Sequence, residues 1–527
     1  MRVAAWIPPV RQCRHVMVRV LVPLAGLAVT VWLLLAEYAT YPAFWFDEGY
    51  KANAARTLAG LGRFASQTTD GLIPYDPGIS GGPADIAAMA LSFTWFGVSV
   101  MAARAPSACF AVVAIVALYG IVRRIHGPRP AALTCLCVLA APPLDGVSVV
   151  LFGRQALAEV PALALLLSGL LLDQWAASRR PPDRGGVSGR VMAGVLWGLA
   201  MLSRQQWALT FGPALLVWVV LPMDWRSPGW PRRAPRALLP VLLMVATVAA
   251  WKAVEYVDSP ATLRAENFAM ALDASRTNLL TGLWGRRLSG MAVVLIAVMA
   301  SAVVAAAAWL SVRRQSLSAE QRRFHGFLIA GVLAHVVWFG LFSVGWPRYA
   351  FPGVFFALVS FAIVAADTAG LAARREPGHR FGAWLTACAV LGAAALAQTP
   401  GSAASRPDTA GEMAAAVTAL VPRNAVIESW EWEIGALIGP ERVHAPHQRY
   451  LFEAIRMRSH EGRPIVLRYD LLQRNPAFLI RGPFEALARV YDDDRLAQCF
   501  RTVLVVEPYT LLARSGCWPV TRPPAER

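Results

Sequence analysis

Long runs of apolar residues constrain this chain more than any other feature, and they recur along its first three quarters. Each run has about 17 to 22 residues, the length that an α-helix needs to cross the hydrocarbon core of a bilayer. Apolar residues make up 56% of the 527 residues, and short polar loops separate the runs. The pattern predicts an α-helical polytopic membrane protein, with the lipid bilayer as its solvent.

The net charge of +17 does not indicate a nucleic-acid-binding protein. The basic residues lie in short clusters between the apolar runs rather than on one basic face, and such clusters mark the cytoplasmic side of a membrane protein. The arginines ahead of Val20–Ala36 resemble the start of a signal peptide. That run is too long and lacks a small-residue cleavage site, so we expect a retained first helix.

Charge asymmetry across the loops predicts about eleven transmembrane helices. Ala84–Val100 is apolar too, but counting it as a span would put every later basic loop on the wrong side, so we expect a juxtamembrane helix there. The chain then starts in the cytoplasm and ends outside, in the inner membrane of a bacterium. The main basic pair left outside is Arg286-Arg287. The expected spans are 20–36, 105–121, 131–144, 160–176, 191–202, 207–223, 237–254, 291–312, 327–344, 351–367 and 381–397.

We expect three parts in the chain. Residues 1–19 form a cytoplasmic N-terminus, and residues 20–398 form a transmembrane domain with outer loops at 37–104 and 145–159. From residue 399 to 527 the composition shifts to Ser, Pro and Gly and then to short alternating runs, which predicts a small extracytoplasmic α/β domain.

Several details of this last domain follow from local patterns. Thr409–Leu420 is expected as a helix, and the strand-like runs are 425–430, 465–469 and 503–506. The outer compartment of a bacterial cell is oxidising, so Cys499 and Cys517 either pair or remain two separate thiols.

An acidic pair, Asp47-Glu48, follows the first span by about ten residues, where it emerges just outside the membrane. Adjacent side chains diverge on a helix, so one carboxylate can face a reaction centre while the other holds a cation or a backbone group. The alternative is a helix N-terminus, where acidic residues are favourable for electrostatic reasons alone.

Three more outer segments carry charges that a membrane surface does not by itself explain. Arg154 and Glu159 stand at the mouth of a span, where charges are costly unless they are paired or functional. Arg204 lies in a short turn between two spans, and Arg348 precedes Tyr349 in an aromatic segment. Arginine binds phosphate through paired hydrogen bonds, so both arginines are candidates for contacts to a lipid phosphate.

Other candidates have simpler explanations. His444, His447 and His460 lack the ligand spacing of a metal site, so we assign no metal ligands and expect scattered surface histidines, with a divalent cation left open as a cofactor. Trp430 and Trp432 share one face of an expected strand and fit packing better than sugar binding. The chain shows neither a nucleotide-binding loop of the Walker type nor a dinucleotide fingerprint.

In their order along residues 20 to 400, these motifs resemble the GT-C class of integral-membrane glycosyltransferases. The relatives that match best are the protein O-mannosyltransferase and lipid A aminoarabinose transferase group. Two positions depart from the family pattern: Arg204 stands where relatives often have lysine, and Glu159 replaces a more usual aspartate. The shared motifs are the acidic pair, Gly97-Val98-Ser99, Arg104–Ser107, Arg123–Gly127, Arg154–Glu159, Gly198–Gln205 and Arg348–Pro352.

The resemblance implies transfer of a sugar from a polyprenyl-phosphate carrier to a cell-envelope acceptor (a glycan, lipid or protein), with inversion at the anomeric carbon. Asp47 is then the general base, with Glu48 orienting or substituting for it. Arg204 and Arg348 would bind the lipid phosphate beside Tyr349, with a contribution from Lys51. Glu159, Arg154 and Lys51 would bind the substrates, and Glu159 would either contact acceptor or donor hydroxyls or steady Arg154.

Two other classes remain open from the sequence. A transporter or flippase of lipid-linked glycans would show inverted repeats and polar residues in the middle of its spans, and neither is evident. A polysaccharide polymerase or ligase would use similar outer loops but consume a lipid-linked oligosaccharide.

Overall fold

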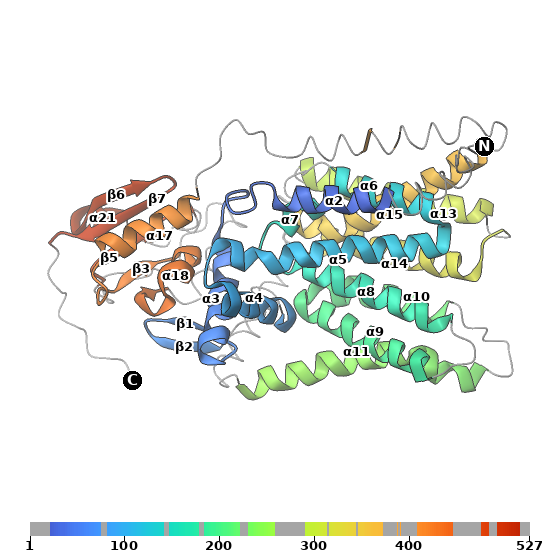
Figure 1. Ribbon diagram of the computed structural model, residues 1–527, viewed down its shortest axis with the longest axis horizontal. Helices are drawn as coiled ribbons and strands as arrows, with labels where there is room; N and C mark the ends of the chain where they lie inside the picture. The colour runs from blue at the N-terminus through green and yellow to red at the C-terminus, as the bar shows by residue number, and fades with distance from the viewer. Residues whose placement is uncertain are drawn as a thin grey trace, which may run out of the picture.

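A computed structural model of the chain describes residues 22–74, 82–141, 147–178, 184–221, 230–258, 290–313, 316–343, 346–372, 387, 390–391, 408–445, 476–483 and 493–516. A bundle of long helices occupies one part of the molecule, and a small α/β domain lies at one end of it (Figure 1). We call this end of the bundle the domain end and the opposite one the far end.

The bundle makes the chain a multi-pass membrane protein. Within the described residues, seven helices are long and apolar enough to cross a bilayer, and three shorter apolar helices accompany them. Each expected span except 381–397, most of which lies outside the described residues, corresponds to one of these ten helices. The pair Arg286-Arg287 also lies outside them. The helices are α2 (Val22–Leu35), α5 (Val100–His126), α6 (Pro128–Ala140), α8 (Glu159–Ala177), α9 (Arg184–Ser203), α10 (Gln206–Val220), α11 (Trp230–Asp258), α13 (Gly290–Arg313), α14 (Ala319–Leu341) and α15 (Phe351–Ala372).

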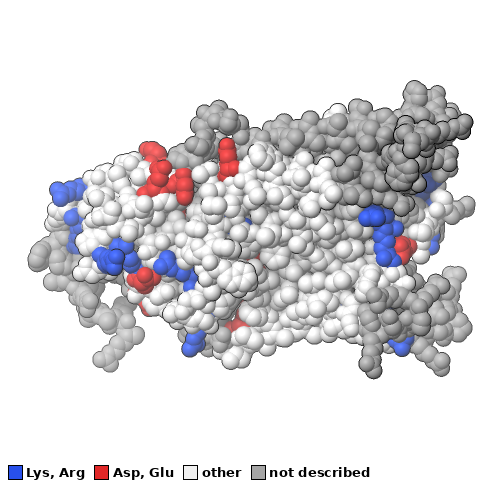
Figure 2. Space-filling view, viewed as in Figure 1, with Lys and Arg blue, Asp and Glu red and all other residues white. Residues whose placement is uncertain are grey.

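The distribution of charge fits a membrane-spanning bundle. Figure 2 shows a broad band across the visible face that is nearly free of Lys, Arg, Asp and Glu, with charged residues toward the two ends. A band without charge is what the hydrocarbon core of a bilayer requires, because an unpaired charge there costs several kcal/mol.

Local sequence explains where the longest spans begin and end. The side chain of Ser99 accepts a hydrogen bond from the amide of Ala102 and caps the N-terminus of α5. At the other end Gly127 adopts a φ of +91°, a conformation that a side chain would strain, and Pro128 then starts α6. This turn reverses the chain directly after the basic residues of α5.

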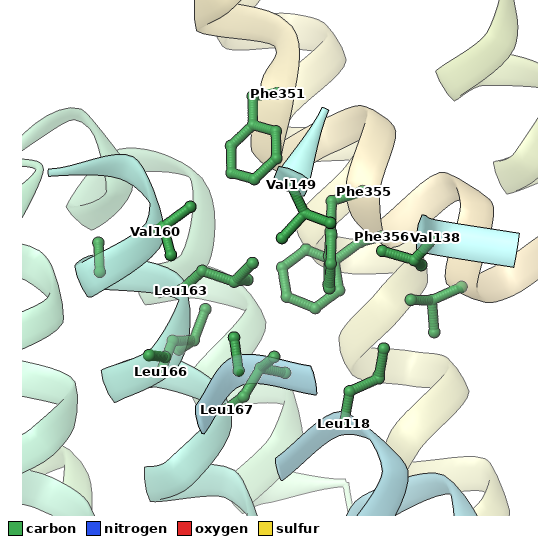
Figure 3. Packing of buried hydrophobic residues seen from close by; sticks show 14 of the residues in the cluster. Leu118, Val138, Val149, Val160, Leu163, Leu166, Leu167, Phe351, Phe355 and Phe356 are labelled. Carbon is green, nitrogen blue, oxygen red and sulfur yellow. The ribbon is translucent and has the colours of Figure 1, made fainter. Parts of the chain in front are cut away.

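Close helix packing depends on small residues. Gly194 and Gly198 lie one turn apart on α9, and a Cβ atom at either position would come within 2.5 Å of atoms of α11. The glycines let α9 and α11 approach backbone to backbone, as small residues do in membrane helix pairs. Deeper in the bundle, leucine and valine side chains of α8 pack against the phenylalanines of α15, with Leu118 of α5 and Val138 of α6 beside them (Figure 3).

A buried polar cluster joins four helices toward the far end. Asp173 of α8 accepts a hydrogen bond from Trp218 Nε1 of α10 at 2.9 Å and forms an ion pair with Arg323 of α14. The Arg323 guanidinium lies 3.9 Å from the centre of the Trp218 ring, and Arg190 of α9 lies 3.9 Å from the other Asp173 oxygen. The cluster compensates the cost of burying each charge in this part of the bundle.

Short elements cover the domain end of the bundle (Figure 1). They are α3 (Phe46–Leu61), the antiparallel hairpin β1 (Ala65–Thr68) and β2 (Gly71–Pro74), α4 (Pro83–Phe96), α7 (Val149–Gly153) and the 3-10 turn η4 (Pro347–Ala350). The juxtamembrane segment expected over Ala84–Val100 corresponds to α4, which ends earlier, at Phe96, and is followed by Gly97 with a φ of +76°. Its exposed Trp95 and Phe96 suit an apolar-to-water interface.

The α/β domain contains a five-stranded sheet in the order β4-β3-β5-β7-β6. Strands β3, β4 and β5 are parallel, whereas β7 runs antiparallel to β5 and β6. The elements are α17 (Thr409–Leu420), β3 (Ile427–Ser429), α18 (Trp432–Ile438), η5 (Pro440–Arg442), β4 (Val443–His444), β5 (Phe478–Arg481), α21 (Asp493–Cys499), β6 (Phe500–Val506) and β7 (Tyr509–Arg514).

Local predictions for this domain are partly right. The helix over Thr409–Leu420 is confirmed, β3 and β6 lie within or across the expected strand runs, and the run 465–469 lies outside the described residues. The shared strand face of Trp430 and Trp432 is wrong, because β3 ends at Ser429 and Trp432 begins α18. Both rings are nevertheless buried.

The cysteines of the described residues fall into two groups. Cys499 is disulfide-bonded, while Cys109, Cys135 and Cys137 are free. The partner of Cys499 therefore lies outside the described residues, as does Cys517.

The polar cluster around Asp173 yields a stability prediction. Asp173→Asn leaves the Arg323 guanidinium without its buried counter-charge, so we expect destabilisation of about 3 kcal/mol or more. Thermal unfolding of the purified protein in detergent measures the effect. Glu412→Gln, at an exposed position of α17, is the matched acid-to-amide control and should change the midpoint little; equal midpoints for the two variants would contradict the assignment.

Candidate active site

The first turn of α3 presents the acidic pair to two different surroundings. Asp47 and Glu48 follow Trp45, whose extended backbone starts the helix, and both lie where a carboxylate interacts favourably with the helix N-terminus. Adjacent residues on a helix point about 100° apart. The two carboxylates accordingly meet different partners, and only one of them is accessible.

Glu48 is completely buried in a network of hydrogen bonds. Its two oxygens accept from Arg104 Nε at 2.9 Å and Arg104 Nη2 at 2.8 Å, and Oε1 also accepts from the Ala156 amide at 2.7 Å. Arg104 in turn donates to the carbonyl of Tyr38 at 3.1 Å. Glu48 thus joins α3 to α5 and to the segment before α8, and its carboxylate is fully occupied by this structural role.

Asp47 points toward a different cation, Arg348 of η4, and forms an ion pair with it. Both side chains keep about a sixth of their surface exposed. The Arg348 guanidinium lies among three aromatic rings, at 5.1 Å from the centre of Trp45, 5.0 Å from Trp346 and 5.1 Å from Tyr349. These rings hold the cation by cation–π attraction, and Arg348 Nη2 also donates a hydrogen bond to the Tyr349 hydroxyl at 3.4 Å.

A second ion pair also lies beside Tyr349. Glu159 begins α8, and its carboxylate pairs with Arg204, which lies in the short turn between α9 and α10. The Arg204 guanidinium is 5.8 Å from the centre of the Tyr349 ring. Two guanidinium groups therefore share one aromatic ring, although their residues are distant in sequence.

Lys51 and Asp85 add a third pair. Lys51 stands one helical turn after Asp47 and therefore on the same side of α3. Its ammonium lies 3.2 Å from Asp85 Oδ2 at the start of α4. Burial lowers the pKa of Lys51 and raises the pKa of Asp85, and the attraction between the two opposes both shifts. Glu159 and Arg204 of the second pair also affect the pKa of Lys51 electrostatically, Glu159 raising it and Arg204 lowering it.

We call these residues, Asp47, Lys51, Asp85, Glu159, Arg204, Arg348 and Tyr349, the charged cluster. Sequence reasoning did not single out Asp85, because an acidic residue at the start of an apolar segment is also what a helix N-terminus favours. One feature of the sequence does indicate Asp85. It lies in the apolar segment Ala84–Val100, which the positions of the later basic loops assign to the membrane surface rather than to a span.

Arg154 lies outside the charged cluster. Its guanidinium is buried and donates from Nε to the carbonyl of Leu33 at 2.8 Å, at the end of α2. The expectation that Glu159 steadies Arg154 is wrong, because Glu159 pairs with Arg204 instead. Arg154 compensates an unpaired carbonyl at a helix C-terminus, where a cation is favourable.

One of the three histidines named from the sequence, His444, is not on the surface as expected. Among the described residues no group of three or more potential ligands could hold a metal ion. His444 is buried rather than on the surface, and it contacts Glu428 through Nδ1 and Asp70 through Nε2 at 3.2 Å. His447 and His460 lie outside the described residues.

Comparison with known proteins identifies the architecture. In the structure of ArnT from Cupriavidus metallidurans bound to undecaprenyl phosphate, 97% of the chain aligns with 94% of this one, at a TM-score of 0.57 and 17% identity. The chain has the GT-C glycosyltransferase fold. The apo ArnT structure from the same organism gives a TM-score of 0.54 at 16% identity over the same shares of both chains.

A second neighbour and a family model agree with the GT-C fold. The archaeal oligosaccharyltransferase AglB from Archaeoglobus fulgidus, in complex with an inhibitory peptide and a dolichol-phosphate, has a TM-score of 0.51 and 12% identity. That alignment covers 96% of this chain and 74% of AglB. Residues 81–251 match the family model for dolichyl-phosphate-mannose-protein mannosyltransferases. A sequence search of curated proteins gives no match. The resemblance to the GT-C class stated from the motifs is thus confirmed.

The different surroundings of the two acids yield a prediction. Glu48→Gln breaks a buried bidentate ion pair and leaves Arg104 uncompensated, so we expect it to lower stability by about 3 to 5 kcal/mol. Asp47→Asn should lower stability much less, because its pair with Arg348 is partly exposed. Thermal unfolding in detergent compares the two variants, and a larger loss for Asp47→Asn would refute the assignment of Glu48 to structure.

Proposed function

We propose that this GT-C glycosyltransferase moves a sugar from a polyprenyl-phosphate carrier to a cell-envelope acceptor at the extracytoplasmic face of the bacterial inner membrane. The observation that carries the proposal is the charged cluster at the domain end. There, the partly exposed carboxylate of Asp47 lies against Arg348, and Arg348 and Arg204 share the ring of Tyr349. The cluster combines a candidate base with two candidate phosphate ligands at the end of a membrane bundle.

The comparisons support the nature of the donor. The ArnT structure contains undecaprenyl phosphate and the AglB structure a dolichol-phosphate, both of them polyprenyl-type carriers, and the matching family is named for a dolichyl-phosphate sugar. A carrier of this kind presents its phosphate at the membrane surface while its chain stays in the bilayer. In the proposed orientation, the charged cluster lies at that depth.

In the proposed reaction the acidic and the basic residues have different roles. An acceptor hydroxyl has a high pKa, so a positioned carboxylate must take its proton as its oxygen attacks the anomeric carbon. We assign this step to Asp47. The new bond forms on the face opposite the breaking bond to the lipid phosphate, which inverts the anomeric configuration. The electron pair of the broken bond goes to the phosphate, whose growing negative charge Arg204 and Arg348 stabilise.

The remaining residues have supporting roles in this proposal. Glu48 fixes the start of α3 and so orients Asp47, Glu159 holds Arg204 in position and can accept from substrate hydroxyls, and Lys51 adds positive charge near the phosphate. Arg154 acts at a distance, by fixing the end of α2. The carrier already supplies an activated bond, and no nucleotide takes part in the step.

Removing the proposed base gives the first test of the function. Asp47→Asn should lower the transfer rate by about 10² to 10⁴-fold, the contribution expected of a general base. Purified protein is incubated with radiolabelled polyprenyl-phosphate sugars and an envelope extract as acceptor, and Glu412→Gln on α17 is the acid-to-amide control. Turnover near wild type for Asp47→Asn would remove Asp47 from the role of base.

The same assay separates the proposal from its rivals. Consumption of a lipid-linked oligosaccharide but of no lipid-linked monosaccharide would indicate a polymerase or ligase. Movement of the labelled lipid across proteoliposomes without release of the carrier phosphate would indicate a transporter.

The phosphate role of Arg204 gives a second test. Arg204→Gln should raise the KM for the donor and lower kcat, because the leaving phosphate loses a cation. Arg204→Lys should keep more activity, because it keeps the charge and loses only the paired donors. Steady-state kinetics with varied donor concentration measure both variants, and equal losses for lysine and glutamine would argue against a phosphate contact.

A further inference from the structure

Helix α3 lies between two neighbours that contact opposite sides of it. Asp47 points toward Arg348 of the bundle. Gly49 stands two residues later and therefore about 200° around the helix, on the other side. That side contacts α18 of the α/β domain, and α3 and α18 lie next to each other at the boundary between the bundle and the domain (Figure 1).

The contact at Gly49 is between two backbones. A Cβ atom at this position would lie 2.1 Å from the nitrogen of Glu433, 2.3 Å from its Cα and 2.4 Å from the carbonyl carbon of Trp432. All three are main-chain atoms at the start of α18, and they cannot rotate away as a side chain can. The absence of a side chain at Gly49 therefore sets how closely α18 approaches α3.

Two further contacts fix the direction of α18 along α3. The Tyr50 and Trp432 rings meet edge to face, with centres 5.0 Å apart. Arg56 lies on the same side as Gly49, two turns later, and its Nη1 donates to the carbonyl of Ala436 at 2.9 Å and to that of Leu437 at 3.4 Å. The start of α18 thus rests on Gly49, and its end is capped by Arg56.

The sheet of the α/β domain also contacts α18, through strand β7. The Tyr509 hydroxyl of β7 donates to Glu433 Oε1 at 2.9 Å. Phe46 and Tyr50 of α3 also belong to the same hydrophobic core as Ile434 of α18 and Leu511 of β7. A continuous chain of contacts therefore runs from the sheet through α18 to α3, and α3 carries Asp47.

We infer that α18 is a positioning element of the active site, and that Gly49 and Arg56 are the residues through which the α/β domain sets the position of Asp47. The inference rests on the proposed function for the role of Asp47. It assigns to the α/β domain a task in the reaction other than binding the acceptor. A displacement of a catalytic group by about 1 Å can lower a rate by about 10²-fold, so small shifts of α3 are sufficient.

Two glycines of the same helix provide a matched pair of variants. Gly49→Ala forces α3 and α18 apart, whereas Gly60→Ala meets nothing within 4 Å. We expect Gly49→Ala to lower kcat by about 10²-fold and to change the donor KM much less, because Arg204 and Arg348 lie on other elements and only Lys51 among the proposed phosphate contacts lies on α3. Gly60→Ala should act like the wild-type chain. Wild-type kcat for Gly49→Ala, or an equal loss for both variants, would overturn the inference.

Arg56 variants test the same element without adding bulk. Arg56→Ala removes both hydrogen bonds to the end of α18, and Arg56→Lys restores one donor. We expect kcat to fall with alanine and to recover in part with lysine, while binding of undecaprenyl phosphate stays the same. Loss of binding in parallel with kcat would show a general structural defect instead and would overturn the inference.

Hydrogen–deuterium exchange over residues 46–61 tests the restraint of α3 by α18 separately from the proposed glycosyl transfer. Faster exchange in Arg56→Ala than in Gly60→Ala would show that α18 restrains α3, whatever the reaction is. If the wild-type chain transfers no sugar, the proposed function fails, and this exchange measurement still supports or overturns the restraint. Equal exchange in the two variants would overturn it.

Discussion

The buried ion pair between Glu48 and Arg104 holds the domain end of this protein together. Two helices and two connecting segments meet at it, since Glu48 also accepts from the Ala156 amide and Arg104 donates to the Tyr38 carbonyl. Two charges without solvent are costly, and here four hydrogen bonds compensate them. Because Glu48 is fixed in this way, its neighbour Asp47 lies on a different side of α3, where it pairs with Arg348.

The charged cluster has a consistent electrostatic design. In the described residues each of its carboxylates lies next to a cation: Asp47 next to Arg348, Asp85 next to Lys51, and Glu159 next to Arg204. Paired charges keep the arginines and the lysine in place at low cost before any substrate arrives. In the proposed function, a donor phosphate entering this site would add negative charge where three paired basic groups are already oriented, and such preorganisation stabilises a charged leaving group.

Much of the membrane part could be predicted from the sequence, because the length of an apolar run is a direct consequence of bilayer thickness. The pairings in the charged cluster could not. Arg348 and Asp47 are 301 positions apart, and nothing local indicates which of several arginines a carboxylate will meet. The adjacency of Asp47 and Glu48 predicts that their side chains diverge, but only the contacts of Glu48 with Arg104 of α5 and with the Ala156 amide show that Glu48 is the buried one. Trp432 was misplaced because an alternating run continued past Ser429, where the chain turns into α18.

The contact between α3 and α18 also affects how the protein is made. Arg56 and its acceptor in α18 are 380 positions apart, and most of the membrane helices lie between them in the chain. During synthesis α3 emerges early, yet the surface that completes its packing appears only after the bundle has been inserted. A chain stopped before α18 would hold an intact bundle with an incompletely packed α3. The arrangement therefore delays the assembly of the site until translation has passed the membrane domain.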